Sequence, residues 1–243
     1  MTRLYEAADH VLIHTGYSDP AAHRHMAAHI IISFAQPMRV TSGDTDARTR
    51  GVMIPSGAIH QIDTHGDTAL VFLFDCTTAV AARIPEIRRL PDEVCDRVIA
   101  LYNAFAISPS PDTYRAMTAA LFSPLCSLPP RPVPDNRIES ALRYIRAHAG
   151  EKLSCRAVAA AVHLSESRFS HLFRQQIGMT FAAYRVYQQL MCAYAAIIRG
   201  NSITDAALAA GFSDSAHFAD VNRRVFGLPA SRITENITHC RIQ

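Results

Sequence analysis

Short runs of apolar residues, separated by turn-forming residues, occupy the first third of the chain. Three runs rich in β-branched or aromatic side chains, a composition typical of strands, cover residues 30–34, 51–54 and 69–74. Turn-forming groups lie around them, at positions 19–20, 42–44, 55–57 and 65–67. Strands this short, at this spacing, predict a small β-barrel or sandwich.

A helical pattern replaces the strand pattern after residue 85. Apolar side chains recur every three or four residues in two stretches, at positions 94, 98, 101 and 105 and at positions 114, 117, 121 and 125. The first stretch follows Asp92 and the second follows Pro111-Asp112, residues that favour the first turn of a helix. The pattern therefore predicts two amphipathic helices, which either pack on the strands or form a dimer seam.

A proline-rich stretch divides the chain. Residues 128–134 contain four prolines in seven positions, which favours an extended linker over helix or strand. Beyond Asp135 the pattern is helical in short pieces that end at glycines. The predicted helices cover about 135–148, 154–162, 166–176, 180–198, 204–210, 214–226 and 229–237.

This last part of the chain contains one structural plan twice. In the first copy a small-residue helix leads through a tight turn to Ser165, which is expected to cap the helix 166–176. In the second copy the turn leads to Ser213 and the helix 214–226. A short helix, a turn, a polar cap and a second helix with Arg, His and Ser make up a helix-turn-helix unit. The two serines are 48 residues apart, which fits two such units joined by one long helix.

Basic residues are concentrated in the same half. Residues 1–134 carry 11 Arg against 13 acidic residues, whereas residues 135–243 carry 12 Arg and one Lys against 8 acidic residues. The net charges of these halves are −2 and +5, so a polyanionic partner is expected at the second half.

The chain resembles the AraC/XylS family of transcription regulators over residues 135–237. The matching strings are 164–174, 178–184, 203–207, 211–218 and 226–229. The resemblance implies a double helix-turn-helix domain that binds double-stranded DNA, an N-terminal ligand-sensing barrel, a homodimer and contact with RNA polymerase. Whether the protein activates or represses stays open.

The residues expected to face DNA are polar positions of the second helix in each unit. In the first unit they are Glu166, Ser167, Arg168, Ser170 and His171, with Arg174 nearer the DNA backbone; in the second they are Ser213, Asp214, Ser215, His217 and Asp220, with Arg223 and Arg224 on phosphates. Arg168 is the residue expected to read a guanine, because its planar fork fits O6 and N7.

Four positions depart from the family pattern. Asp220 replaces a usual Arg or Lys, Asn222 a usual aromatic residue, Ala216 a usual Ser, and Gln189 a usual Arg. A carboxylate repels phosphates but accepts a hydrogen bond from a cytosine amino group. The second unit therefore either reads an unusual sequence or contributes less affinity than the first, unless these are surface positions that have drifted without consequence.

The first part of the chain is similar, more loosely, to the cupin-type sensor barrels of the same family. The similarity lies in residues 23–29 and 55–60, where cupins place metal ligands. It implies four candidate imidazole ligands, His23, His25, His29 and His60, a set that suits Zn, Ni, Cu or Fe. The alternative is that these histidines line a pocket for a small organic effector, or only pack.

These observations predict an α+β chain of two domains. A cupin-like sensor barrel is expected over 1–90, a helical dimerisation or packing segment over 91–128, a linker over 129–134 and an AraC-type DNA-binding domain over 135–243. The expected function is sequence-specific regulation of transcription in response to a small molecule or metal ion. Two alternatives stay open: a metal-dependent cupin enzyme fused to a DNA-binding domain, and a constitutive DNA-binding protein whose barrel only dimerises.

Short motifs, cysteine spacing and apolar runs bear on enzymatic activity and on localisation. The chain has no GxSxG, P-loop or HExxH motif, so enzymatic activity is not expected. Its six cysteines lack CxxC spacing and are interpreted as reduced thiols. It has no apolar run of eighteen residues and no visible secretory signal, so a cytoplasmic protein without a membrane partner is expected.

Overall fold

The computed structural model describes residues 2–7, 10–18, 21–24, 26–126, 135–148, 151, 153–226 and 237–241. The chain forms two compact units. The first contains residues 1–131 together with 235–243, and the second contains residues 132–234. The division near residue 131 falls inside the proline-rich stretch that the sequence marks as a linker.

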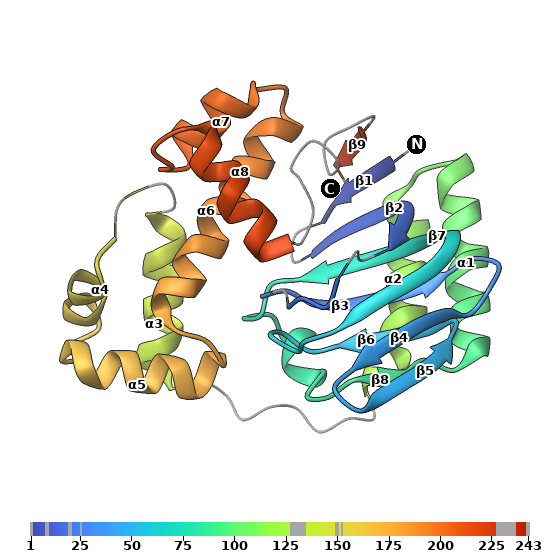
Figure 1. Ribbon diagram of the computed structural model, residues 1–243, viewed down its shortest axis with the longest axis horizontal. Coiled ribbons are helices and arrows are strands. Elements are labelled where there is room, and N and C mark those ends of the chain that lie inside the picture. Colours follow the sequence, from blue (N-terminus) through green and yellow to red (C-terminus); the bar gives the residue numbers. More distant parts are fainter. Residues whose placement is uncertain are drawn as a thin grey trace. The chain divides into compact units, whose positions relative to one another are not determined.

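The first unit is built on one sheet (Figure 1). Its strands are β1 (Thr2–Glu6), β2 (His10–Ser18), β3 (Ala28–Ser33), β4 (Met38–Ser42), β5 (Thr45–Thr49), β6 (Gly51–Ile54), β7 (Gln61–Phe74), β8 (Arg88–Arg89) and β9 (Ile237–Arg241). The three apolar runs in the sequence correspond to β3, β6 and the second half of β7. A 3-10 turn, Ala81–Arg83, follows β7.

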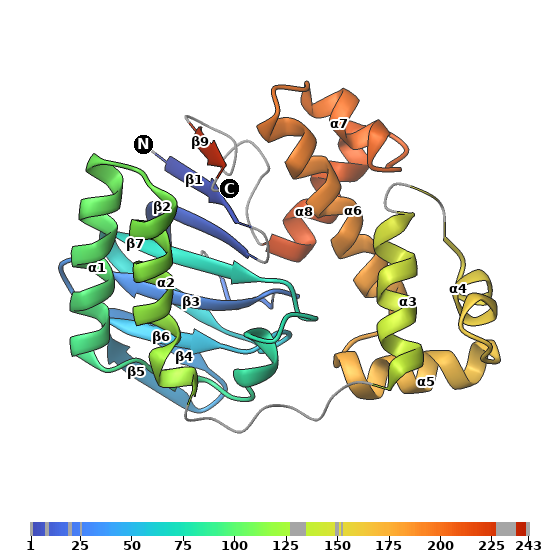
Figure 2. The same ribbon diagram turned by 180° about the vertical axis from the view of Figure 1, so that it is seen from behind.

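The strands do not form the predicted cupin-like barrel. Among the described strands the order is β8-β6-β3-β7-β2-β1-β9, and the β4–β5 hairpin pairs with β7 without closing the sheet. The β-rich character of this unit is therefore confirmed, whereas its closure is not. Among the described strands β8 pairs with β6 and β9 pairs with β1, and no pairing joins these two ends of the order, while helices cover one face of the sheet (Figure 2).

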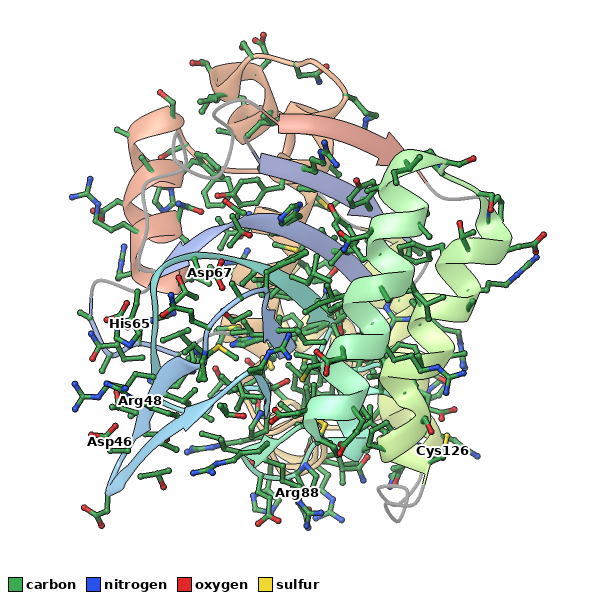
Figure 3. All side chains as sticks on the ribbon, turned by 90° about the vertical axis from the view of Figure 1, so that its right-hand side faces the viewer. Asp46, Arg48, His65, Asp67, Arg88 and Cys126 are labelled. Carbon is green, nitrogen blue, oxygen red and sulfur yellow. The ribbon has the colours of Figure 1, made fainter. Side chains whose placement is uncertain are left out.

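Strand β7 is unusually long because it bends without ending. The sequence predicts a turn at 65–67, but His65 and Gly66 take positive φ angles, 54° and 83°, within a continuous strand. The first half of β7 pairs with β4 and the second half with β2 and β3. At the bend, the carboxylate of Asp67 (labelled in Figure 3) accepts hydrogen bonds from Ser33 Oγ at 3.0 Å and Ala35 N at 2.6 Å. Burial opposes the ionised form, but these hydrogen bonds lower the pKa of Asp67, so the bend is held by a carboxylate.

Helices α1 (Asp92–Ile107) and α2 (Pro111–Cys126) confirm the two predicted amphipathic helices. Their buried side chains, among them Tyr102, Phe105 and Met117, join one cluster with alternate residues of the sheet. Burying one such side chain contributes roughly 1.5–3 kcal/mol relative to leaving it exposed. Packing on the sheet, the first of the two alternatives, is what the structure shows for these helices.

The opposite face of the sheet has its own apolar lining. In β3, Ala28, Ile30 and Ile32 contact the helical side, while Ile31 belongs to a second cluster on the other side. That second cluster consists of Ile31, Met38, Val40, Val52, Ile54, Ile62, Ala69 and Val71. Because side chains alternate along a strand, His29 shares the face of Ile31.

The second unit is helical. Its helices are α3 (Asn136–Ala147), α4 (Cys155–Ala161), α5 (Glu166–Ile177), α6 (Phe181–Ile198), α7 (Ile203–Ala209) and α8 (Ser215–Phe226). Side-chain caps start five of them, from Asp135, Ser154, Ser165, Thr180 and Ser202. Helix α5 ends at Gly178, whose φ of 84° lies in the left-handed region. None of the helices within the described ranges is both long and apolar enough to cross a bilayer.

The end of the chain departs from the sequence prediction. A helix is expected over 229–237, but Ile237 begins strand β9, which pairs in parallel with β1. Residues 227–236 lie outside the described part of the chain. The predicted DNA-binding domain, 135–243, also differs from the observed second unit, because residues 235–243 belong to the sheet unit. The reason is a long-range strand pairing that no local periodicity reveals.

Candidate nucleic-acid interface and histidine cluster

Helix α5 presents polar side chains on one face and core residues on the other. The buried face consists of Phe169, Leu172, Phe173 and Ile177. The candidate DNA-facing residues are all exposed: Glu166, Ser167, Arg168, Ser170, His171 and Arg174. The Ser165 hydroxyl accepts from the backbone N–H of Arg168 at 3.3 Å and so fixes the helix start. The exposed face is thus held rigidly and carries two arginines that are available to a polyanion.

Helix α8 starts one residue later than the sequence predicts. The Asp214 carboxylate accepts from the backbone N–H of His217 at 2.7 Å, so Asp214, rather than Ser213, occupies the capping position. The Ser213 hydroxyl contacts His217 Nδ1 at 3.1 Å. The hydrogen bonds from His217 N and Ser213 lower the pKa of Asp214. Three of the predicted DNA-facing residues are therefore also partners in one local cap.

The remaining predicted residues of α8 differ in exposure and pairing. His217, Asp220, Arg223 and Arg224 are exposed, whereas Ser215 is half-buried. Arg224 Nη2 lies 3.1 Å from Asp220 Oδ2, one helical turn away. Arg223 thus offers its charge to a phosphate directly, while Arg224 shares its charge with a carboxylate.

A groove beside α8 adds residues that the sequence analysis missed. It measures about 450 Å³ and is lined by Arg185, Gln189, Leu208, Gly211, Phe212, Ser213 and His217. Arg185 comes from the connecting helix α6, where nothing in the recognition-helix pattern points to it. Gln189 Nε2 donates to the carbonyls of Ala210 and Gly211, both at 3.2 Å, and so supports the turn before α8.

In the sheet unit, His60 lies next to two of the other candidate metal ligands, His29 and His23. His29 Nε2 lies 3.1 Å from His60 Nε2, and both residues are 1% exposed. The ring centroid of His23 lies 4.9 Å from that of His60, and His23 and His60 are joined by two backbone hydrogen bonds. His25 lies outside the described residues. His29 lies on β3, which begins at Ala28, so His23 does not share its strand.

The pKa values of the buried pair are lowered. Burial lowers the pKa of His60 to about 4, and the nearby His23 adds to this, although a hydrogen bond to the Ala58 carbonyl opposes it. Burial, and then the neighbouring His60 and His23, lower the pKa of His29 well below its usual value. Both imidazoles are therefore neutral at pH 7, the form in which imidazole binds a transition metal or shares a hydrogen bond.

The cluster only partly fits the four-histidine metal site. Nε2 atoms 3.1 Å apart can both reach one ion, because Zn–N bonds measure about 2.0–2.1 Å. Among the described residues, however, no three His, Cys, Asp or Glu side chains converge on a point that could hold a metal ion. The described residues thus supply a pair of imidazole donors, and the four-imidazole site stays a prediction.

Comparison with known proteins identifies sequences that are similar to the helical unit. A helix-turn-helix family model matches residues 158–236. The regulatory protein PocR of Salmonella typhimurium is 35% identical over 93 residues, which are 38% of this chain and 31% of PocR. The arabinose operon regulatory protein of Escherichia coli is 34% identical over 102 residues, which are 41% of this chain and 35% of that protein. Over its helical unit, the chain is thus similar to the DNA-binding region of the AraC family.

The fold comparison extends over both units. The structure of an apo single-residue variant of ToxT from Vibrio cholerae covers 96% of this chain and 100% of the ToxT chain, with a TM-score of 0.71 at 6% identity. The fatty-acid-bound form of wild-type ToxT covers 94% of this chain and 95% of that one, with a TM-score of 0.63 at 9% identity. At such identities the likeness shows the fold alone. The chain spans about a third of the length of PocR and of the arabinose operon protein in these matches.

Two departures from the AraC-family pattern have structural explanations. Asn222 is fully buried and accepts a hydrogen bond from the Tyr194 hydroxyl across to α6. A buried amide with a hydroxyl partner thus replaces the usual aromatic packing. Gln189 replaces a usual Arg and binds the two carbonyls of the α7–α8 turn. Ala216 is exposed, and nothing in the structure explains its departure from Ser.

The Asp220–Arg224 pair leads to a first prediction. Asp220→Asn should strengthen DNA binding and steepen the dependence of log Kd on log salt by about one, because Arg224 becomes available to a phosphate. The measurement is a salt titration of DNA affinity. The matched control is Asp112→Asn, which removes a similar exposed helical ion pair, with Arg115, from the sheet unit. Weaker binding by Asp220→Asn, confined to sites with one particular base pair, would instead make Asp220 a reader of cytosine.

Proposed function

We propose that this protein is a sequence-specific DNA-binding transcription regulator whose sheet unit binds a small-molecule effector. The observation that carries the proposal is the pair of capped helices α5 and α8, each with an exposed polar face and each in contact with the connecting helix α6. Two such helices suit adjacent major-groove faces of one DNA site, about one helical turn apart. The related proteins PocR and the arabinose operon protein are regulators by name, which supports the same function here.

The DNA-binding part is tested with Arg168. We expect selection from random DNA to recover a preferred sequence, and Arg168→Ala to weaken binding to it by about 1–3 kcal/mol and to relax the preference at one guanine. Fluorescence anisotropy with single-base variants of the selected site measures both effects. Arg115→Ala, which removes an exposed arginine from α2, is the control. Equal weakening on every sequence would make Arg168 a phosphate contact, and failure to select any sequence would contradict the proposed function.

An apolar small molecule is the proposed effector class. Buried aliphatic side chains line the sheet face opposite α1 and α2, and the neutral His29–His60 pair lies at that lining. These side chains are packed together in the ligand-free structure, so we propose that the cluster opens to admit an apolar ligand, which the polar imidazoles would orient. One ToxT structure of the same fold holds an unsaturated fatty acid, and another holds a naphthalenyl butenoic acid, both with apolar bodies.

Metal ions are the second candidate effectors, and one experiment separates the two. Thermal melts of the untagged protein are compared with medium-chain and long-chain fatty acids and with Zn, Ni, Cu and Fe. Stabilisation by an organic acid that also shifts DNA affinity supports the proposed effector class. Stabilisation by a metal that His60→Ala abolishes supports the metal site instead. No shift from either group contradicts effector binding and favours a constitutive DNA-binding protein, while turnover of a bound acid favours an enzyme.

The partners follow from the same proposal. Double-stranded DNA is the primary partner, and an asymmetric site of about two helical turns per protomer is expected from two recognition helices on one rigid support. We propose RNA polymerase contact and homodimerisation as further properties. Analytical ultracentrifugation with and without DNA tests the second of these.

A further inference from the structure

Strand β9 connects the two units in an unusual way. In the chain it follows α8, the second recognition helix, but in space it belongs to the sheet unit (Figure 1). It pairs with β1 over five registered residues, from Thr2 opposite Ile237 to Glu6 opposite Arg241. The helical unit, residues 132–234, is therefore inserted between two segments of the sheet unit and is attached to it at both ends.

The pairing of β9 is parallel, whereas the other pairings between the described strands are antiparallel. A parallel neighbour cannot come from a hairpin and needs a crossover connection. Here the chain between β1 and β9 includes the whole helical unit, residues 132–234. The β1–β9 ladder thus closes one large loop, whose entropic cost grows only slowly with its length.

Both connections to the helical unit are short. Helix α2 ends at Cys126 and α3 begins at Asn136, while α8 ends at Phe226 and β9 begins at Ile237. Fully extended, connections of these lengths span at most about 35 Å and about 39 Å. The start of α3 therefore stays within about 35 Å of the end of α2. While β9 is paired with β1, the end of α8 also stays within about 39 Å of the start of β9, a limit that the first connection does not impose.

The partner strand β1 is anchored in the core that α1 covers. The Tyr5 ring packs edge-on against Phe105, with centroids 5.0 Å apart, and the Tyr5 hydroxyl lies 3.5 Å from that of Tyr102. The Tyr102 hydroxyl in turn bonds His14 Nδ1 on β2 at 2.8 Å. A rearrangement of this core would move β1. Because β9 pairs with β1, that movement would displace β9 and alter the restraint on α8, which precedes β9 in the chain.

We propose that β9 is a clasp: it binds the helical unit to the sheet unit independently of the linker at 129–134, and it restrains DNA binding until it is released. The clasp itself is a claim about structure alone, whereas the restraint rests on the proposed DNA-binding function. Two measurements separate them.

The first measurement cuts the linker. Residues 129–134 are replaced by a site-specific protease sequence, and the cleaved protein is passed over a size-exclusion column. We expect the two fragments to elute together, and to separate when residues 237–241 are replaced by Gly-Ser-Gly-Ser-Gly, a sequence with low strand propensity. The control Ile237→Val with Thr238→Val keeps strand propensity and should keep the fragments together. Fragments that separate with the natural β9, or stay together without it, would overturn the clasp, as would a dimer that exchanges β9 between copies.

Hydrogen exchange on the uncut proteins keeps this test decisive if the cleaved variant is unstable. The amides of β1 should exchange faster in the Gly-Ser variant, while those of β3 and α1 stay protected. Loss of protection throughout the sheet would show that β9 is an ordinary part of the fold, and unchanged protection of β1 would show that β9 does not pair with it.

The second measurement is the DNA affinity of the uncut proteins on the selected site. Release of β9 should tighten binding by about fivefold or more, the lower range of measured coupling between sites, and the valine control should bind as the natural protein does. Equal or weaker binding by the Gly-Ser variant would overturn the restraint. If no variant binds any DNA specifically, the proposed function fails while the result of linker cleavage still stands.

Discussion

The protein should lose stability steeply as the pH falls from about 6.5 towards 4, because the His29–His60 pair is buried in its neutral form. Burial lowers the pKa of His60 to about 4, against 6.5 in the unfolded chain, and burial also lowers the pKa of His29 well below its usual value. Between these values the unfolded chain binds protons that the folded chain does not. Stability from the pair is therefore complete above about pH 6.5 and declines below it. One pKa unit corresponds to about 1.4 kcal/mol, so His60 alone accounts for a loss on the order of 3 kcal/mol.

Thermal melts between pH 7.5 and pH 4.5 measure this effect. The variant His60→Gln should be less stable at pH 7.5 but should show a flatter decline, because one of the two buried bases is gone. His171→Gln, which changes an exposed histidine on α5, should follow the natural curve. An unchanged slope in His60→Gln would mean that acid unfolding starts elsewhere in the molecule.

Gly51→Ala should destabilise the sheet unit by about 3 kcal/mol. A Cβ at this position of β6 would lie 2.5 Å from Cys95 Sγ on α1 and 2.9 Å from Leu90 Cβ. Both neighbours are buried, Cys95 fully, so neither side chain can move away without disturbing the core. Overpacking of this kind lowers the free energy of unfolding by about 1–3 kcal/mol. The absence of a side chain at residue 51 is what lets α1 approach the sheet here.

Urea unfolding of paired variants tests this explanation. Gly16→Ala, on β2, is the matched control, because no atom lies within 4 Å of a Cβ there, and its stability should change by less than about 0.5 kcal/mol. Adding Cys95→Ala to Gly51→Ala should recover part of the loss, since it removes the closest atom. If the double variant is as unstable as the sum of the two single variants, the contact with Sγ is not the cause.

The helical unit could be predicted in detail from the sequence because its signals are local. Ser165 and Gly178 fix the two ends of α5 within a dozen residues, and the apolar spacing between them defines its buried face. For α8 the same local signals predict a cap at Ser213, one residue before the observed cap at Asp214. Ser and Asp both suit a capping position, and only the hydrogen bond from His217 N distinguishes them.

The sheet unit was less predictable because its decisive contacts join residues far apart. His65 and Gly66 are equally suited to a turn and to a bend within a strand, and the pairing of β7 with three other strands decides between them. Likewise, the sequence 237–241 carries too little pattern to indicate that it pairs with β1. His29 and His60 were singled out together by similarity to a motif, but their burial and their direct contact depend on the fold.

Helix α6 fixes the rotation and the distance between helices α5 and α8. Its 18 residues span about 27 Å as a single rod, capped at Thr180 and packed against both α7 and α8. Each inserted residue would turn one end of this rod by about 100° relative to the other and lengthen it by about 1.5 Å, so one insertion would point α8 away from the DNA face proposed for α5. The distance between the two halves of the proposed DNA site is therefore set by the length of one helix. Under the proposed function, a substitution on α5 or α8 would change which base is read, whereas the spacing would change only by whole residues inserted into or removed from α6.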